Sequence, residues 1–347
     1  MKQDYCKVIR CVLLLVVVSV LAEISMAGRG DKSGTSAAPE LLIPVGARDL
    51  ALGGASLALT QGIEAIYWNP AGLPRSSYGT EALFSHMNYI ADIGIDYFAV
   101  STSFEGFGTI GLSLKSIGFG EFEITTEDVP DGTGEKFSPT YVTLGLTYSR
   151  LLTDRISVGI TTHLISERID RVSATGVAFT AGLQYHGFAS VEGLSIGVAV
   201  KNIGPAMKFD GPGLLRDAVA TGNLRPASFY KVEAASDELP SSIELGLGYI
   251  YKLDDENNLS VTSLFQNNNL SADEYKFGLE YAFNNLLFLR GGYVLSQESR
   301  PDSHIFGATV GGGVHYATSS LDITFDYAYR SVKFLDANHV FSMKLGF

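Results

Sequence analysis

The side chains that most often carry catalysis are scattered in this 347-residue chain. Its six histidines include no pair at the spacing of metal ligands. They are His86, His163, His186, His304, His315 and His339. The sequence has no glycine-rich phosphate loop followed by lysine and no His-Glu-x-x-His zinc motif. We therefore predict no catalytic residues, no metal and no cofactor. The alternative is a Ser-His-Asn site assembled from distant strands, which sequence spacing does not reveal.

Acidic residues gather in one stretch, residues 118–139, between two segments with strand character. They are Glu121, Glu123, Glu127, Asp128, Asp131 and Glu135. Carboxylate oxygens suit calcium, but the spacing does not match the loop of an EF-hand. The stretch is either a calcium-binding loop or an ordinary solvated loop, and the missing EF-hand spacing favours the second interpretation.

Apolar and polar residues alternate through most of the chain, which is typical of strands with one apolar face. In residues 321–330 every odd position is apolar, and the even positions are Asp, Thr, Asp, Ala and Arg. Residues 275–283 repeat this pattern. Such strands belong either to a half-buried sheet of a soluble protein or to a membrane barrel with lipid outside and a polar lumen inside.

About fourteen segments share this alternation, and each is long enough to cross a bilayer at a tilt. They cover residues 82–90, 95–104, 107–117, 140–150, 155–168, 173–186, 193–203, 242–251, 258–266, 273–283, 286–296, 304–316, 321–330 and 338–347. The two longest connections, residues 118–139 and 204–241, follow the third and seventh segments, so they lie at the same end. Short turns at one end and long loops at the other are typical of outer-membrane barrels. Because lipid tolerates no open sheet edge, we predict an all-β fold, a closed transmembrane antiparallel β-barrel.

The polar face of the predicted strands carries charges of both signs, which we expect to point into the lumen. They are Glu244, Lys276, Glu280, Arg290, Asp322, Asp326, Arg330 and Lys344. Charged groups at this depth either pair with one another and with a segment inside the barrel, or contact a ligand. Pairing is the favoured interpretation.

Residues 1–27 are interpreted as a signal peptide, because basic residues precede an apolar core of about eleven residues, too short to span a bilayer. A membrane anchor is the alternative. Cys6 and Cys11 lie in this segment, so the mature chain would have no disulfide. The formal net charge of −12 does not suit nucleic-acid binding, which needs a basic surface.

Residues 28–80 have apolar content without period two and are interrupted by glycine and proline. We predict a lead-in followed by a plug in the barrel lumen, with the barrel itself covering residues 81–347. The alternative is a small subdomain outside the barrel. The predicted plug motif consists of Gly46, Ala47, Arg48, Gly53, Gly54, Trp68, Asn69, Pro70 and Ala71.

The final predicted strand is apolar at every second position and ends on Phe347. We expect Phe341, Leu345 and Phe347 to form the signal that the barrel-insertion machinery reads, and the outward face of the barrel to contact outer-membrane lipid.

Two stretches support a family resemblance. Ile-Pro-Val-Gly-Ala-Arg at residues 43–48 is followed by Leu-Gly-Gly-Ala at residues 52–55 and by Ile-Tyr-Trp-Asn-Pro-Ala-Gly-Leu at residues 66–73. Together they resemble the N-terminal signature of the PorV/PorQ family, which is similar in fold to the FadL fatty-acid transporters. The resemblance implies a fourteen-stranded barrel in the outer membrane of a Gram-negative cell, with the N-terminal segment inside.

The resemblance also implies two alternative functions. The first, which is the favoured interpretation, is transport of hydrophobic small molecules across the outer membrane. The second is a barrel of the type IX secretion system that binds or shuttles exported proteins through its outer loops. An apolar tunnel from the mouth to the wall or plug would favour transport, whereas a lumen sealed by charge pairs and an apolar outer rim would favour secretion.

Overall fold

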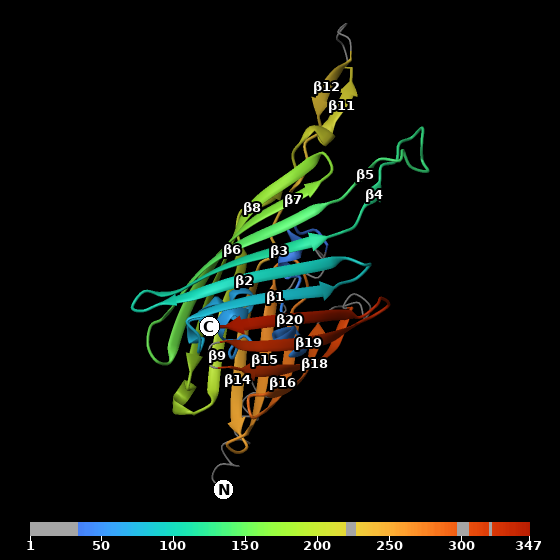
Figure 1. Ribbon diagram of the computed structural model, residues 1–347. Coiled ribbons are helices and arrows are strands. Elements are labelled where there is room, and N and C mark those ends of the chain that lie inside the picture. Colours follow the sequence, from blue (N-terminus) through green and yellow to red (C-terminus); the bar gives the residue numbers. More distant parts are fainter. Residues whose placement is uncertain (1–33, 220–226, 297–304, 319–320) are drawn as a thin grey trace.

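The computed structural model describes residues 34–219, 227–296, 305–318 and 321–347, and the segment interpreted as a signal peptide lies outside them. Fourteen antiparallel strands form a closed barrel, as Figure 1 shows. Their bounds are β1 Thr80–Asn88, β2 Gly94–Phe104, β3 Gly108–Gly118, β6 Thr140–Leu151, β7 Ile156–Ile169, β8 Val172–His186, β9 Leu194–Ile203, β14 Ser242–Lys252, β15 Asn257–Asn268, β16 Glu274–Phe283, β17 Leu287–Ser296, β18 Phe306–Ala317, β19 Asp322–Val332 and β20 Asn338–Gly346. The predicted fold class is confirmed.

Alternation along each strand separates an outward apolar face from an inward polar face. In β16, Phe277 and Leu279 are exposed on the outer surface, whereas Gly278 and Glu280, which alternate with them, are buried. Neighbouring strands continue the sheet until β1 pairs with β20, where Phe84 lies opposite Met343. This closure satisfies the backbone hydrogen bonds of both terminal strands, which an apolar environment requires. No helix in the described ranges is long and apolar enough to cross a membrane.

Three short two-stranded sheets extend two of the long connections, a detail that the sequence did not predict. They are β4 Phe122–Glu123 with β5 Lys136–Phe137, β10 Met207–Lys208 with β13 Ser236–Asp237, and β11 Leu215–Ala218 with β12 Ser228–Lys231. Both connections emerge from the same end of the barrel, toward the top of Figure 1, and β11 and β12 lie farthest from it. We call residues 204–219 and 227–241 the outer arm.

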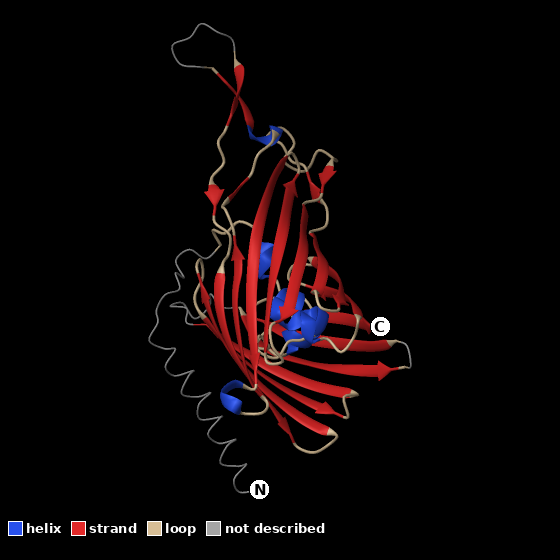
Figure 2. Cartoon of the chain, turned by 90° about the vertical axis from the view of Figure 1, so that its left-hand side faces the viewer, coloured by secondary structure: helices blue, strands red, loops and turns tan. Residues whose placement is uncertain are grey.

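The segment before β1 folds into short helical turns inside the barrel, which Figure 2 shows in blue. They are η3 Pro39–Leu42, α2 Ala47–Ala51, η4 Gly62–Glu64, α3 Ala65–Trp68 and η5 Pro70–Arg75. Pro39 begins η3 and Pro70 begins η5, positions where the missing N–H of proline is tolerated. Pro74 lies one residue before the end of η5, and its ring disfavours a longer helix. We call residues 34–79 the N-terminal segment; its action as a plug stays a prediction.

Candidate functional site

Buried ion pairs connect the N-terminal segment with the barrel wall. Arg290 on β17 donates from Nε to Glu280 on β16 at 2.6 Å and from Nη1 to Asp326 on β19 at 2.5 Å. Arg48 on α2 adds a second cation, with its Nε 3.5 Å from the same Glu280 carboxylate and its Nη1 3.2 Å from Asp49. Charges this deeply buried are tolerated when they are paired and hydrogen-bonded.

Other predicted lumen charges form separate pairs. Lys344 on β20 lies 3.2 Å from Glu64 of the N-terminal segment. Glu244 lies 3.0 Å from Lys201. The partners Glu64 and Lys201 were not among the predicted site residues, although Lys201 occupies an inward position in the alternation of β9.

The remaining three predicted charges have different surroundings. Lys276 lies 3.0 Å from Glu274, two residues earlier on the same strand. The Arg330 guanidinium lies 3.8 Å from the centre of the Phe306 ring and donates to Asn338. Asp322 is only partly buried, near His315. The structure therefore brings Glu280, Arg290 and Asp326 together but does not gather all eight charges into one site.

The motif residues fix the N-terminal segment to itself and to the wall. Asn69 donates through Nδ2 to the carbonyl oxygens of Leu57 and of Leu183 on β8, while its Oδ1 accepts from the Ala71 amide at the start of η5. Trp68 donates its indole N–H to the Val45 carbonyl at 3.1 Å. The motif therefore has a structural role in this chain.

Inward-facing glycines let the N-terminal segment lie directly against the wall. A Cβ at Gly182 would lie 2.0 Å from Asn69 Oδ1, and one at Gly292 would lie 2.2 Å from the backbone nitrogen of Gly53. Similar close approaches to the segment occur at glycines on seven other strand positions. We call the whole set the glycine seat: Gly111, Gly159, Gly182, Gly197, Gly246, Gly248, Gly278, Gly292 and Gly311. Because the seat extends over eight strands from β3 to β18, the segment contacts the wall around much of its circumference.

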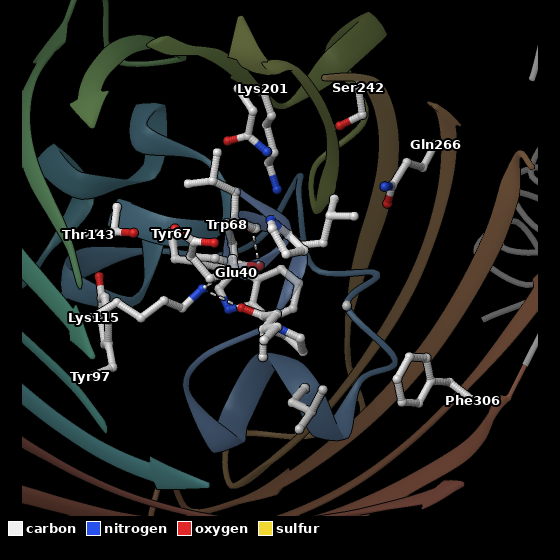
Figure 3. Close-up of a pocket in the computed structure, with 18 of the residues that line it drawn as sticks. Glu40, Tyr67, Trp68, Tyr97, Lys115, Thr143, Lys201, Ser242, Gln266 and Phe306 are labelled. Atoms are coloured by element: carbon white, nitrogen blue, oxygen red, sulfur yellow. Dashed lines mark hydrogen bonds between the residues drawn. The ribbon is translucent and has the colours of Figure 1, made fainter. Parts of the chain in front are cut away.

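A cavity of about 580 Å³ lies between part of the N-terminal segment and the wall. Figure 3 shows Tyr67 and Trp68 at its centre, with Tyr97 and Phe306 from the wall. The ammonium group of Lys201 lies 5.6 Å from the centre of the Tyr67 ring. Aromatic and aliphatic side chains provide much of the lining, and lysines, amides and carboxyls interrupt it, so the cavity suits a partly apolar molecule.

A family model described as "Type IX secretion system protein PorV" matches residues 27–271, well over half of the chain. The chain belongs to the PorV family. No curated protein is detectably similar to it in sequence. Several solved structures resemble its fold. Their sequence identity to this chain is 12–14%, so the similarity concerns the fold alone.

Three of these structures are hydrocarbon channels or a FadL homologue. "CymD monoaromatic hydrocarbon channel" has 14% identity and a TM-score of 0.56, covering 88% of this chain and 98% of that one. The Pseudomonas putida toluene transporter TodX has 12% identity and a TM-score of 0.54, with coverage of 86% and 96%. A Pseudomonas aeruginosa FadL homologue has 13% identity and a TM-score of 0.52, with coverage of 87% and 98%. This PorV-family chain therefore has a FadL-like barrel fold.

Ser195 and His186 of the PorV-family chain are in contact, and the sequence analysis did not predict this pair. Ser195 Oγ lies 3.0 Å from His186 Nδ1, and His186 Nε2 lies 3.3 Å from Gln184 Oε1. Ser195 lies within Gly-Leu-Ser-Ile-Gly, a spacing found at hydrolase nucleophiles, but here it occupies a barrel strand instead of a strand-to-helix turn. Because Ser195 is 2% exposed, its hydroxyl is not open to a substrate.

The remaining predicted sites are the acidic connection and the last strand of the PorV-family barrel. Among the described residues, no cluster of three or more potential ligands could hold a metal ion. In the acidic connection, Lys136 pairs with Glu121 at 3.1 Å. Along β20, Phe341 within the strand and Phe347 just after it are exposed on the outward face, and Leu345 is half-buried there. Recognition by the insertion machinery stays a prediction.

Proposed function

We propose that this protein is a closed barrel of a secretion machinery, which engages exported or partner proteins through the outer arm. The observation that supports this function is the contrast between a lumen occupied by the tightly seated N-terminal segment and an arm with exposed apolar side chains. That contrast matches the pattern expected of a secretion barrel. The family match agrees with it.

The lumen has two kinds of contact that oppose free passage. Buried ion pairs link Arg48 to Glu280 and Glu64 to Lys344, on separate strands of the wall. At the glycine seat the segment lies directly against the wall, which leaves little room for a solute at those positions. Moving the segment would expose several charges at once, which is costly where water is excluded.

The outer arm has the properties of a docking element. Phe229 and Val219 are 72% and 62% exposed, and every residue of β11 and β12 is exposed. An isolated two-stranded sheet is marginally stable in water. In the outer arm, two ion pairs support this sheet: Lys208 with Glu233, and Lys231 with Asp210. A supported arm with apolar side chains in water indicates a protein partner.

The test is native mass spectrometry of the barrel extracted from outer membranes, comparing the unaltered chain with Phe229→Ser. We expect a co-purifying exported protein that is lost in the arm variant. Val129→Ser, in the other outer connection, is the control and should retain the protein. Retention of the same protein by Phe229→Ser would contradict docking through the arm.

Transport of hydrophobic small molecules is the second candidate, and the aromatic cavity favours it. It requires a route past the N-terminal segment or through the wall. Lipid extraction of the same preparation tests it, because a bound apolar molecule lost on Trp68→Ala, together with measurable uptake into liposomes, would support transport. An empty cavity and impermeable liposomes would contradict it.

A further inference from the structure

The start of the N-terminal segment forms one side of the cavity, and its Ala38 and Leu41 pack against apolar side chains of the wall. We call residues 37–43 the strap. Lys115 on β3 donates to the carbonyl oxygens of Glu40 at 2.8 Å and of Ile43 at 2.5 Å, as Figure 3 shows around Glu40. Tyr67 donates its hydroxyl to the Leu41 carbonyl at 3.2 Å. These bonds use backbone oxygens of the strap, so they leave its one acidic side chain uncompensated.

That side chain, Glu40, faces the carboxyl of Glu167 on β7. The two residues are 1% and 2% exposed. Both carboxyl oxygens of Glu40 and Oε1 of Glu167 have no hydrogen-bond partner among the described residues. Within that same part of the chain, neither carboxyl has a cation within ion-pair distance. Two buried carboxyl groups that face each other cannot both be ionised at low cost, so at least one holds a proton.

Burial, together with the facing Glu167, raises the pKa of Glu40 from 4.5 to about 8. The other charged or titratable groups nearby are Lys115 from β3, Tyr141 from β6 and His163 from β7. Only Lys115 among them opposes this rise, and its ammonium group already binds the strap carbonyls. The geometry therefore makes the strap's attachment to β7 depend on a proton.

We propose that Glu40 and Glu167 form a proton-dependent latch that holds the strap against β7 and releases it, opening one side of the cavity, as the pH rises. The latch does not depend on which of the two functions is correct. In either case it would control access to Trp68 and the aromatic part of the cavity.

The sign of the dependence follows from the direction of the pKa change. Glu40 binds its proton more tightly when the strap is docked than when the strap is free in water. Docking is therefore most favourable below pH 4.5 and loses strength as the pH rises to about 8. Across this interval the ratio of docked to released strap falls by up to about tenfold per pH unit.

Trp68 provides a native probe, because it is the only tryptophan of the chain and its indole binds the Val45 carbonyl just beyond the strap. The experiment measures acrylamide quenching of tryptophan fluorescence in the purified full-length barrel between pH 5 and pH 9. We expect the quenching constant to rise with pH. In Glu40→Gln, which resembles the protonated side chain in shape and charge, it should stay at the low-pH value. Glu167→Gln should make the rise smaller or move it to higher pH, because an ionised Glu40 disfavours the docked strap less without the facing negative charge.

Glu121→Gln, in the outer acidic connection, is the control and should follow the unaltered chain. Heat-modifiable gel mobility shows that each variant is a folded barrel before it is compared. A quenching constant that is flat from pH 5 to pH 9 in the unaltered chain would overturn the latch, since a strap that never opens regulates nothing. An identical rise in folded Glu40→Gln would also overturn it, because a different group would then be titrating.

Discussion

The N-terminal segment and the outer arm are the two largest departures from regular barrel structure, and their side chains meet opposite surroundings. Ala47, Ala51 and Ala58 in the segment are fully buried, whereas Phe229 at the arm is 72% exposed. Arg48 and Glu64 of the segment pair with charges on the wall, but the arm's ion pairs lie in water. The segment is therefore largely enclosed by this chain's own wall, while the arm leaves apolar side chains in water, as the proposed docking requires.

Breaking the central charge group should have the largest effect. Arg290→Met leaves Glu280 and Asp326 buried with one cation fewer, and we expect a loss of about 3–5 kcal/mol in the free energy of unfolding. Lys136→Met removes an exposed ion pair and should change it by at most about 1 kcal/mol. Urea unfolding of both variants in detergent micelles measures the difference. Equal effects would show that the buried group contributes no more than a surface pair.

Two adjacent glycines on β17 test the glycine seat. A Cβ at Gly292 would meet the backbone of Gly53 at 2.2 Å, whereas one at Gly291 would have no neighbour closer than 3.9 Å. Gly292→Ala should therefore cost about 1–3 kcal/mol through overpacking, and Gly291→Ala should be nearly neutral. Acrylamide quenching of Trp68 and thermal unfolding report displacement of the segment. The seat would be unimportant if the two variants behaved alike.

Asn69→Asp examines the motif by a nearly isosteric change. The carboxylate can still accept from the Ala71 amide, but it no longer donates to the Leu57 and Leu183 carbonyls. Leu57 keeps its hydrogen bond from Gln184 Nε2, but losing both Asn69 bonds and burying a carboxylate beside carbonyl oxygens should cost about 1–3 kcal/mol. Susceptibility of the N-terminal segment to protease measures the loosening, with Asn88→Asp on the outer face as the control. Protection equal to that of the unaltered chain would contradict the structural role of Asn69.

The arm should show the smallest effect on stability. Phe229→Ser and Leu215→Ser alter exposed positions, so each should change the free energy of unfolding by no more than about 0.5 kcal/mol. Partner binding should nevertheless fall. Thermal unfolding and quantitative pull-down of an identified exported protein separate the two properties. A strongly destabilised arm variant would mean that the arm packs on the barrel and is not a free docking element.

The alternation of side chains allowed the fold to be predicted from the sequence. Every predicted strand corresponds to a barrel strand with small shifts at its ends, because the period-two pattern is set by burial against lipid and lumen. The predicted segment 304–316, for example, is β18 at Phe306–Ala317. The inward positions of Glu280 and Arg290 also followed from this pattern, since a strand fixes which face each residue occupies.

The pairing of charges could not be predicted in the same way. Alternation places Lys344 and Lys201 on the inner face but does not identify their partners, which depend on register and on an irregular segment. Glu40 and Glu167 were missed for the same reason, since they are separated by more than a hundred residues and only folding brings them together. The short sheet of β11 and β12 was missed because all its residues are exposed. Neither of its faces is buried, so burial imposes no alternation of apolar and polar residues on its sequence.

The bonds between the N-terminal segment and β20 have a consequence for assembly. The backbone nitrogen of Ala47 donates to Ser342 Oγ at 2.8 Å, so the N-terminal segment contacts the strand that completes the ring. These bonds form only when β20 has joined the sheet, because β20 is the strand at which the ring closes onto β1. Seating of the segment and closure of the ring are therefore coupled steps of assembly.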